Sequence, residues 1–279
     1  MILPEIPIGN TVEAVVYWVN DNLGFLLDLF SKFINTLISE FREVLLFLSP
    51  IAFILIVTAI VYIISQRDVK LTLGTVIGFL LIENMGLWKL SMETISLVLS
   101  SAAMALFIGI PAGILAAKNE IAFHIVKPIL DFMQTMPSFV YLIPAVIFFG
   151  LGNVPGLVAT VMFAMPPAVR LTTLGIRQVP VELNEVANAF GTTSTQKLLK
   201  VELPIALPTI MAGVNQCIML SLSMVVIAAM IGARGLGYQV LVGIQRVDIA
   251  QGFEAGLGIV IIAIVLDRLT QSITPKNKI

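Results

Sequence analysis

The chain has 279 residues, of which 58% are hydrophobic and 12% are charged. Soluble domains carry roughly 25% charged residues, so the composition excludes a soluble enzyme, a disordered chain and a nucleic-acid-binding protein. The net charge of −1, from 16 Lys and Arg against 17 Asp and Glu, creates no field that would attract nucleic acid. We therefore predict an all-α membrane protein that crosses the lipid bilayer several times and binds no nucleic acid.

The first 43 residues predict an amphipathic helix that does not cross the membrane. Apolar residues recur at spacings of three and four over 11–43, while charged residues such as Asp21, Asp28 and Lys32 interrupt them. Because a span tolerates few charges, the helix is expected to lie along the outer membrane face or to pack on the bundle, and Gly24 marks a point where it could break. A structural brace is the simplest role, and regulation or membrane sensing is the alternative.

Seven transmembrane helices are predicted from apolar runs long enough to cross a bilayer, which takes about 20 residues. Their ranges are 44–65, 71–88, 93–117, 128–150, 154–176, 206–231 and 253–271. Lys and Arg gather in connections that alternating threading places on one side, namely Arg67, Lys70, Lys118, Lys127, Arg177, Lys197 and Lys200, with Lys276 and Lys278 in the C-terminal tail. Since positive charge marks the cytoplasmic side, we expect the N-terminus outside and the C-terminus in the cytoplasm.

The connection over about 180–204, on the expected cytoplasmic side, has the pattern of two short helices joined at a glycine. Pro180 suits the first turn of a helix, and Gly191 suits the left-handed conformation that ends one. The hydroxyl residues after the glycine can cap a second helix running to about Glu202, and Pro204 is expected to stop it. Such a loop favours docking on a partner, with packing on its own bundle as the alternative.

The spacing of certain residues in this connection is specific. Glu185, Val186 and Ala187 are followed after three residues by Gly191, and after nine more by Val201, Leu203 and Pro204. This spacing resembles the EAA loop of ABC-importer permeases, with Val186 and Val201 replacing an alanine and an isoleucine of that pattern. The resemblance implies that the loop docks in a cleft of a separate ATPase subunit. ATP and Mg²⁺ would bind to that subunit, and this chain would hold no cofactor.

Further segments resemble another group of known proteins. They are LDFMQTMPSFVYLIPAVIFFGLGNVPG (130–156), FAMPPAVRLTTLGIRQVP (163–180), MAGVNQCIMLSLSMVVIAAMIGARGLG (211–237) and IVLDRLTQ (264–271). These segments are similar to the permeases of glycine betaine/proline importers. The resemblance implies that 91–272 form a five-helix type I ABC permease core, after an outer N-terminal helix (1–43) and two extra spans (44–90), and before a cytoplasmic tail (273–279).

The resemblance also implies an assembly and a function. The expected assembly is a homodimer of permeases in the cell membrane, with two ATP-binding cassette subunits and a separate extracytoplasmic substrate-binding protein. The expected function is ATP-driven import of glycine betaine and related compatible solutes. Choline, carnitine or proline are the alternative solutes, because the binding protein carries most of the specificity.

Polar residues at depth are candidates for the translocation path, because a zwitterion needs polar groups without a fixed unpaired charge. The candidates are Gln134, Thr135 and Pro137 in the fourth span and Asn215 and Gln216 in the sixth. Hydrogen bonding between helices is an equal alternative for the polar side chains. On the outer side, Arg234 and Arg246 in the glycine-rich connection 232–252 are candidates for contact with the binding protein, with plain surface charge as the alternative.

Two other classes of membrane protein fit the sequence less well. A self-contained channel or ion-coupled carrier usually has ionisable residues at mid-membrane, and the predicted spans hold none away from their ends apart from Glu83. An integral-membrane enzyme would show clustered histidines or carboxylates. One histidine and one cysteine leave too few ligands for a metal site built on these side chains, so no catalytic or metal residue is assigned and no enzymatic activity is expected.

Overall fold

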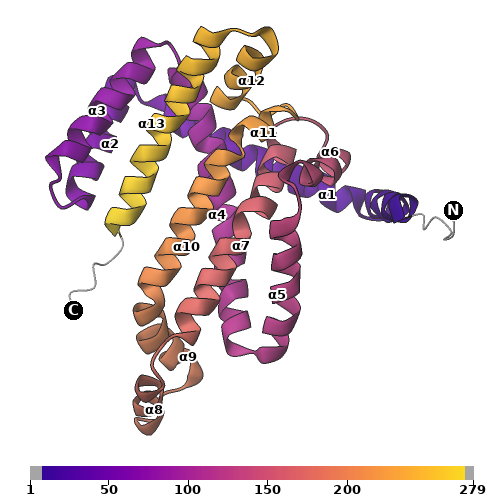
Figure 1. The fold of residues 1–279 in the computed structure, drawn as a ribbon, viewed down its shortest axis with the longest axis vertical. Helices are drawn as coiled ribbons and strands as arrows, with labels where there is room; N and C mark the ends of the chain where they lie inside the picture. The colour runs from indigo at the N-terminus through magenta and orange to yellow at the C-terminus, as the bar shows by residue number, and fades with distance from the viewer. Residues whose placement is uncertain (1–7, 274–279) are drawn as a thin grey trace.

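The computed structural model describes residues 8–273, which form a bundle of helices with no strand among them (Figure 1). The helices are α1 (Ile8–Phe47), α2 (Pro50–Ile64), α3 (Val69–Asn84), α4 (Trp88–Lys118), α5 (Glu120–Thr135), η1 (Ser138–Tyr141), α6 (Leu142–Phe149), α7 (Asn153–Arg177), α8 (Val181–Ala189), α9 (Ser194–Lys197), η2 (Leu198–Glu202), α10 (Leu203–Ser223), α11 (Val225–Ala229), α12 (Leu236–Arg246) and α13 (Ile249–Ile273). The all-α class is confirmed. The ends of the chain, with Lys276 and Lys278, lie outside the described residues.

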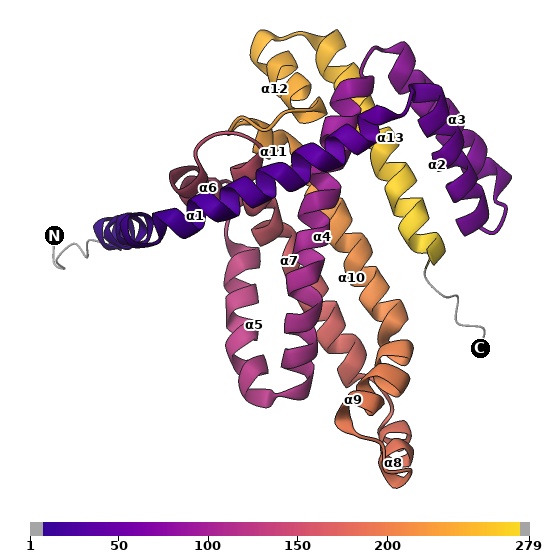
Figure 2. The same cartoon turned by 180° about the vertical axis from the view of Figure 1, so that it is seen from behind.

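Helix α7 lies at the centre of the bundle, between α5 and α10, and packs along α4 (Figures 1 and 2). The approach of α4 to α7 depends on a glycine, because a Cβ on Gly113 would lie 2.7 Å from the carbonyl oxygen of Val169 and 2.6 Å from the Cβ of Thr172. The Thr173 hydroxyl donates a hydrogen bond of 3.0 Å to the Gly113 carbonyl. Such close contact holds helices together in lipid, where the tails are as apolar as leucine.

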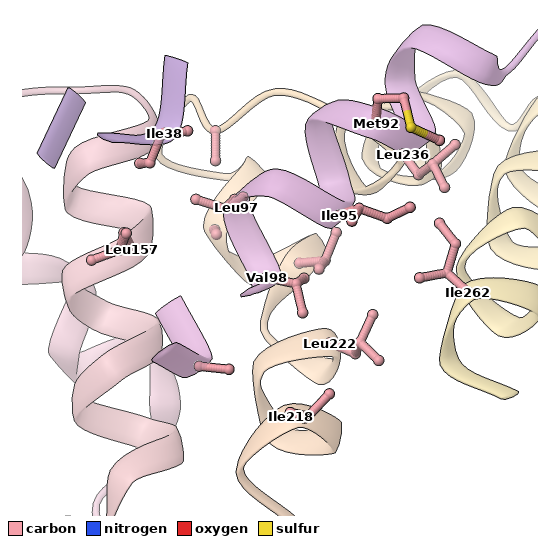
Figure 3. Close-up of a cluster of buried hydrophobic side chains, with 14 of the residues drawn as sticks. Ile38, Met92, Ile95, Leu97, Val98, Leu157, Ile218, Leu222, Leu236 and Ile262 are labelled. Carbon is pink, nitrogen blue, oxygen red and sulfur yellow. The ribbon is translucent and has the colours of Figure 1, made fainter. Parts of the chain in front are cut away.

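One buried apolar cluster joins the helices toward the end of the bundle that carries α11 and α12 (Figure 3). Its members come from α1 to α4, α7 and α10 to α13, and include Ile38, Val98, Leu157, Leu222, Leu236 and Ile262. The opposite end of the bundle carries α8 and α9 (Figure 1). The two connections that the sequence singles out therefore lie at opposite ends of the molecule.

The number of spans differs from the seven predicted. Within residues 8–273, four helices are long and apolar enough to cross a membrane, namely α4, α7, α13 and the run Ser194–Ala229, and the number reaches six if each of two bent pairs is counted as one span. The span predicted over 128–150 is not one helix, because α5 and the run Ser138–Phe149 meet at 107°. Pro137 causes the break, since it lacks an N–H and pushes Met136 into an extended conformation (φ −71°, ψ 131°).

Helix α1 is continuous through Gly24, so the break considered there does not occur. The sharp bend comes later, at 99° between α1 and α2, where the Ser49 side chain accepts from the Ala52 N–H and Pro50 begins the next helix. Figure 2 shows α1 lying across the bundle instead of along it. Its buried apolar side chains are Ile34 and Ile38, so most of the helix packs on no other part of the described chain.

The connection 232–252 is not an open loop. It holds α12, which packs against α13 at a close approach of two glycines, where a Cβ on Gly243 would lie 2.7 Å from the Cα of Gly252. The chain reverses at Val247, which adopts the left-handed conformation (φ 58°). Gly243 and Gly252 therefore allow two helices to pack closely, although glycines in a connection suggest a loop.

Candidate functional site

The first part of the connection between α7 and α10 forms the two short helices that the sequence predicts. Helix α8 ends before Gly191, which adopts a φ of +70°, and Thr193 caps α9. The cap is a capping box: the Gln196 N–H donates to the Thr193 hydroxyl at 3.3 Å, and the Thr193 N–H donates to the Gln196 side chain at 2.9 Å. Two helices joined at a glycine are therefore confirmed.

The predicted stop at Pro204 is wrong. Helix α9 runs through the π-helical turn η2 into α10, and Pro204 lies in the first turn of α10. A proline lacks an N–H and crowds the carbonyl four residues back, here that of Lys200, and the wider π turn accommodates it without ending the helix. Leu203 packs beside Ile176 and Ala206 instead of marking the end of the loop.

Helix α8 presents an exposed apolar face. Val186 is 53% exposed and Phe190, at its C-cap, is 84% exposed, whereas Ala187 is buried toward α9 and η2. Glu182 and Glu185 are exposed beside them. Val186 and Phe190 therefore do not pack on the bundle, and this face of α8 is exposed.

Behind this surface, two ion pairs join the ends of the long helices. Lys118, at the end of α4, pairs with Glu202, whose side chain is 5% exposed at the start of α10. Arg177, at the end of α7, pairs with Glu120 of α5 at 3.0 Å and donates to the Ala116 carbonyl at 3.0 Å. Its guanidinium also lies 4.0 Å from the centre of the Phe123 ring. The position of the connection is thus fixed to α4 and α7.

The residues predicted for the path lie in two places. Gln134, Thr135 and Pro137 are exposed at and just beyond the end of α5, whereas Asn215 and Gln216 lie on α10, and α7 separates the two helices (Figure 1). The Asn215 amide donates to Asp267 of α13 at 2.9 Å, so its observed contact is between helices. Gln216 lines an open cavity of about 490 Å³ along α10. One copy of the chain does not bring the two sets together.

An ion pair inside the spans was missed by the sequence analysis. The Arg170 guanidinium of α7 donates to the Asp131 carboxylate of α5. The two residues are 39 positions apart, and hydropathy alone places both close to the ends of predicted spans. The helical spacing of Asp131, Gln134 and Thr135 on one face of α5 is the pattern that could have found this site.

At the other end, the two candidate arginines are separate. The Arg234 backbone N–H donates to the Asn153 side chain at 3.0 Å, and its exposed side chain lines a cavity of about 630 Å³ with Lys32 and Arg42 of α1. Arg246 is exposed at the far end of α12 and is not among the residues that line this cavity. Of the two, Arg234 is the one beside a cavity.

Comparison with known proteins finds clear similarity. Residues 109–278 match the family described as the binding-protein-dependent transport system inner membrane component. The chain is 47% identical to the glycine betaine transport system permease protein OpuAB of Bacillus subtilis, over 99% of this chain and 97% of that one. It is 49% identical to the glycine betaine/carnitine transport permease protein GbuB of Listeria monocytogenes, over 99% and 98%.

A third relative and a solved structure extend the comparison. The chain is 43% identical to the glycine betaine/proline betaine transport system permease protein ProW of Escherichia coli, over 96% of this chain and 77% of that one. Among solved structures, an inward-facing form of the MetNI methionine ABC transporter matches with a TM-score of 0.60 and 22% identity, over 68% of this chain and 96% of that one. This match shows the fold.

Proposed function

The chain belongs to the family of binding-protein-dependent transport system inner membrane components, and from this premise we propose that it is the permease subunit of an ATP-driven importer for glycine betaine and related compatible solutes. Its apolar helices and its family make it a multi-pass inner membrane protein. Relatives named for glycine betaine, carnitine and proline betaine transport support this class of solute. Choline, carnitine and proline are the alternative solutes.

The observation that carries the proposal is the exposed apolar face of α8 next to the left-handed Gly191. We infer that Glu185, Val186, Ala187 and Gly191 seat this helix in a separate ATPase subunit, which binds ATP and Mg²⁺ and performs the hydrolysis. Buried apolar surface stabilises by about 25 cal/mol per Å², so a helix held out from the bundle with its apolar side chains exposed favours a partner.

The proposed orientation places the α8–α9 end in the cytoplasm and the N-terminus outside. Lys118 and Arg177 end α4 and α7, Lys197 and Lys200 lie in α9 and η2, and Lys127 lies in α5. Positive charge marks the cytoplasmic side. The α11–α12 end would then face the substrate-binding protein, with Arg234 and Arg246 as candidate contacts.

We propose that two copies enclose the path. Gln134 and Thr135 on α5 and Gln216 on α10 are exposed in the single chain, and polar side chains inside a membrane favour a water-filled cavity or a protein neighbour over lipid. A homodimer with two ATPase subunits would cover these faces and place the solute between the copies.

The test is uptake into proteoliposomes that hold this chain, its ATPase and its binding protein. Uptake of labelled glycine betaine should require ATP on the side of the ATPase and fall with unlabelled competitor. Competition by choline, carnitine and proline would define the range. Uptake that proceeds at the same rate without ATP would contradict the proposal and favour a self-contained carrier.

A further inference from the structure

An ion pair lies within the length of two membrane helices. Asp131 of α5 and Arg170 of α7 are paired, and α5 and α7 run side by side (Figures 1 and 2). At a rise of 1.5 Å per residue, Arg170 lies about 10 Å inside the end of α7 at Arg177, and Asp131 lies about 16 Å along α5 from Glu120. The pair therefore lies within the length of both helices, away from the helix ends at Glu120 and Arg177.

The pair is exposed in the single chain, with side-chain exposures of 52% for Asp131 and 42% for Arg170. Charged groups are costly against hydrocarbon, so this face of α5 and α7 does not suit lipid. Among the described residues, each of the two side chains has the other as its one ionic partner. The remaining donors of Arg170 and the second carboxylate oxygen of Asp131 are therefore free to bind a ligand.

Helix α5 has two exposed faces of opposite character. Gln134 and Thr135 follow Asp131 at the spacings that share a helix face, and both are exposed. The other exposed face is apolar and holds Ile121, Ile125, Ile129 and Phe132, which are 53–72% exposed. The apolar face suits lipid, so the polar face is the one that faces water or a second protein chain.

The pair also lies beside a cavity between α5 and α7. Its volume is about 290 Å³, the space of roughly ten water molecules in the liquid. Apolar side chains line it, including Phe123, Leu130 and Leu174, and Asp131 and Arg170 contribute opposite charges. Arg177 also lines it, but its guanidinium is already engaged by Glu120 and the Ala116 carbonyl. Lys127 lines it too, with its ammonium 5.9 Å from the centre of the Phe123 ring, so the cavity is apolar and holds one carboxylate, that of Asp131, among three cationic side chains.

We propose that Asp131 and Arg170 form a binding point in the translocation path for a small zwitterion, an inference that rests on the proposed function. A guanidinium binds a carboxylate with two parallel hydrogen bonds. A quaternary ammonium has no N–H, so Asp131 attracts it by charge while the apolar wall contacts its methyl groups. The solute exchanges one ion pair for two, and no net charge is left behind.

This arrangement also selects between solutes. A zwitterion satisfies both members of the pair, whereas a plain cation such as choline satisfies Asp131 and leaves Arg170 facing a positive charge. A site in a transport path must also release its solute, and the pair assists release because it re-forms when the solute leaves. The pair therefore explains how the permease itself can favour a zwitterion delivered by a binding protein.

The test measures water access and solute protection in the permease–ATPase complex in nanodiscs. In a C217S background, which removes the buried cysteine, the Q134C variant reports on the polar face of α5 and I129C on the apolar face. A charged thiol reagent should label Q134C and leave I129C unlabelled. Glycine betaine should slow labelling of Q134C. R170Q or D131N should raise the glycine betaine concentration needed for half-maximal protection by about tenfold.

The matched control is E83Q, which removes a charge at an exposed position of α3 outside this cavity and should leave the protection unchanged. Choline should be needed at a higher concentration than glycine betaine to protect Q134C from labelling. R170Q should reduce this difference in concentration. An unlabelled Q134C, or protection that survives both R170Q and D131N, would overturn the proposal. Uptake is measured separately on the unmodified complex, so a failure of ATP-driven transport is distinguishable from a failure of this site.

Discussion

Lys118 and Glu202 pair across the joint between the end of α4 and the start of α10. The carboxylate is nearly buried, and within the described part of the chain the ammonium of Lys118 is its one ionic partner. Removing one member of a buried pair leaves an uncompensated charge, which costs about 3–5 kcal/mol, whereas replacing both by apolar residues is often neutral.

We therefore expect K118M to destabilise the chain strongly and K118M/E202L to recover most of the loss. The measurement is thermal unfolding of the purified chain in detergent, followed by tryptophan fluorescence. Equal losses in the single and the double variant would show that packing, and not charge, holds this joint. E120Q provides a comparison, because Glu120 is largely exposed and its pair should be worth about 1 kcal/mol or less.

Gly191 tests the conformation of the proposed docking loop. Its φ of +70° is costly for a residue with a Cβ, by about 1–2 kcal/mol, although no atom lies within 4 Å of a Cβ built there. G191V should therefore distort the α8–α9 turn and lower copurification of the ATPase subunit and uptake together. G191N is the matched control, since asparagine tolerates this conformation, and unchanged uptake by G191V would contradict the docking role.

Phe190 tests the exposed apolar face directly. The side chain is 84% exposed, so F190S should change the free energy of unfolding of the isolated permease by no more than about 0.5 kcal/mol. It should nevertheless weaken association with the ATPase, measured by copurification at increasing dilution of the complex. A loss of stability in the isolated chain, without a loss of association, would place Phe190 in the fold instead of the interface.

Gly113 tests the packing of α4 against α7. A methyl group there would clash with the Val169 carbonyl and with Thr172, so G113A should force the helices apart and lower the melting temperature. G74A is the control, because no atom lies within 4 Å of a Cβ at Gly74 in α3. Alanine in the middle of a helix there should stabilise by about 0.5–1 kcal/mol. A melting temperature unchanged by G113A would contradict the close packing.

Local signals in the sequence predicted much of the fold. The class follows from composition, and the two helices around Gly191 follow from cap chemistry that acts within a few residues. Hydropathy failed at Pro137, because the apolar run continues across the break while the backbone turns. It failed again at α12, where Gly243 and Gly252 meet only after the chain reverses at Val247.

The candidate sites divide in the same way. The proposed docking loop is contiguous in sequence, so its residues could be assigned together. Asp131 and Arg170 come from different helices, and only the packing of α5 on α7 shows that they form a pair. Asn215 shows the reverse: a polar residue in a span suggests a path, but its partner Asp267 on α13 is visible only in the fold.

The unbroken run from α9 through the π turn to α10 has a mechanical consequence. From Ser194 to Ser223 it forms one rod of about 44 Å, which begins at the proposed docking loop and ends at the far side of the bundle. If the rod pivots at its base, a tilt of about 10° displaces its far tip by roughly 8 Å. A small rotation at the α8–α9 end of the bundle would therefore produce a much larger displacement at the opposite end.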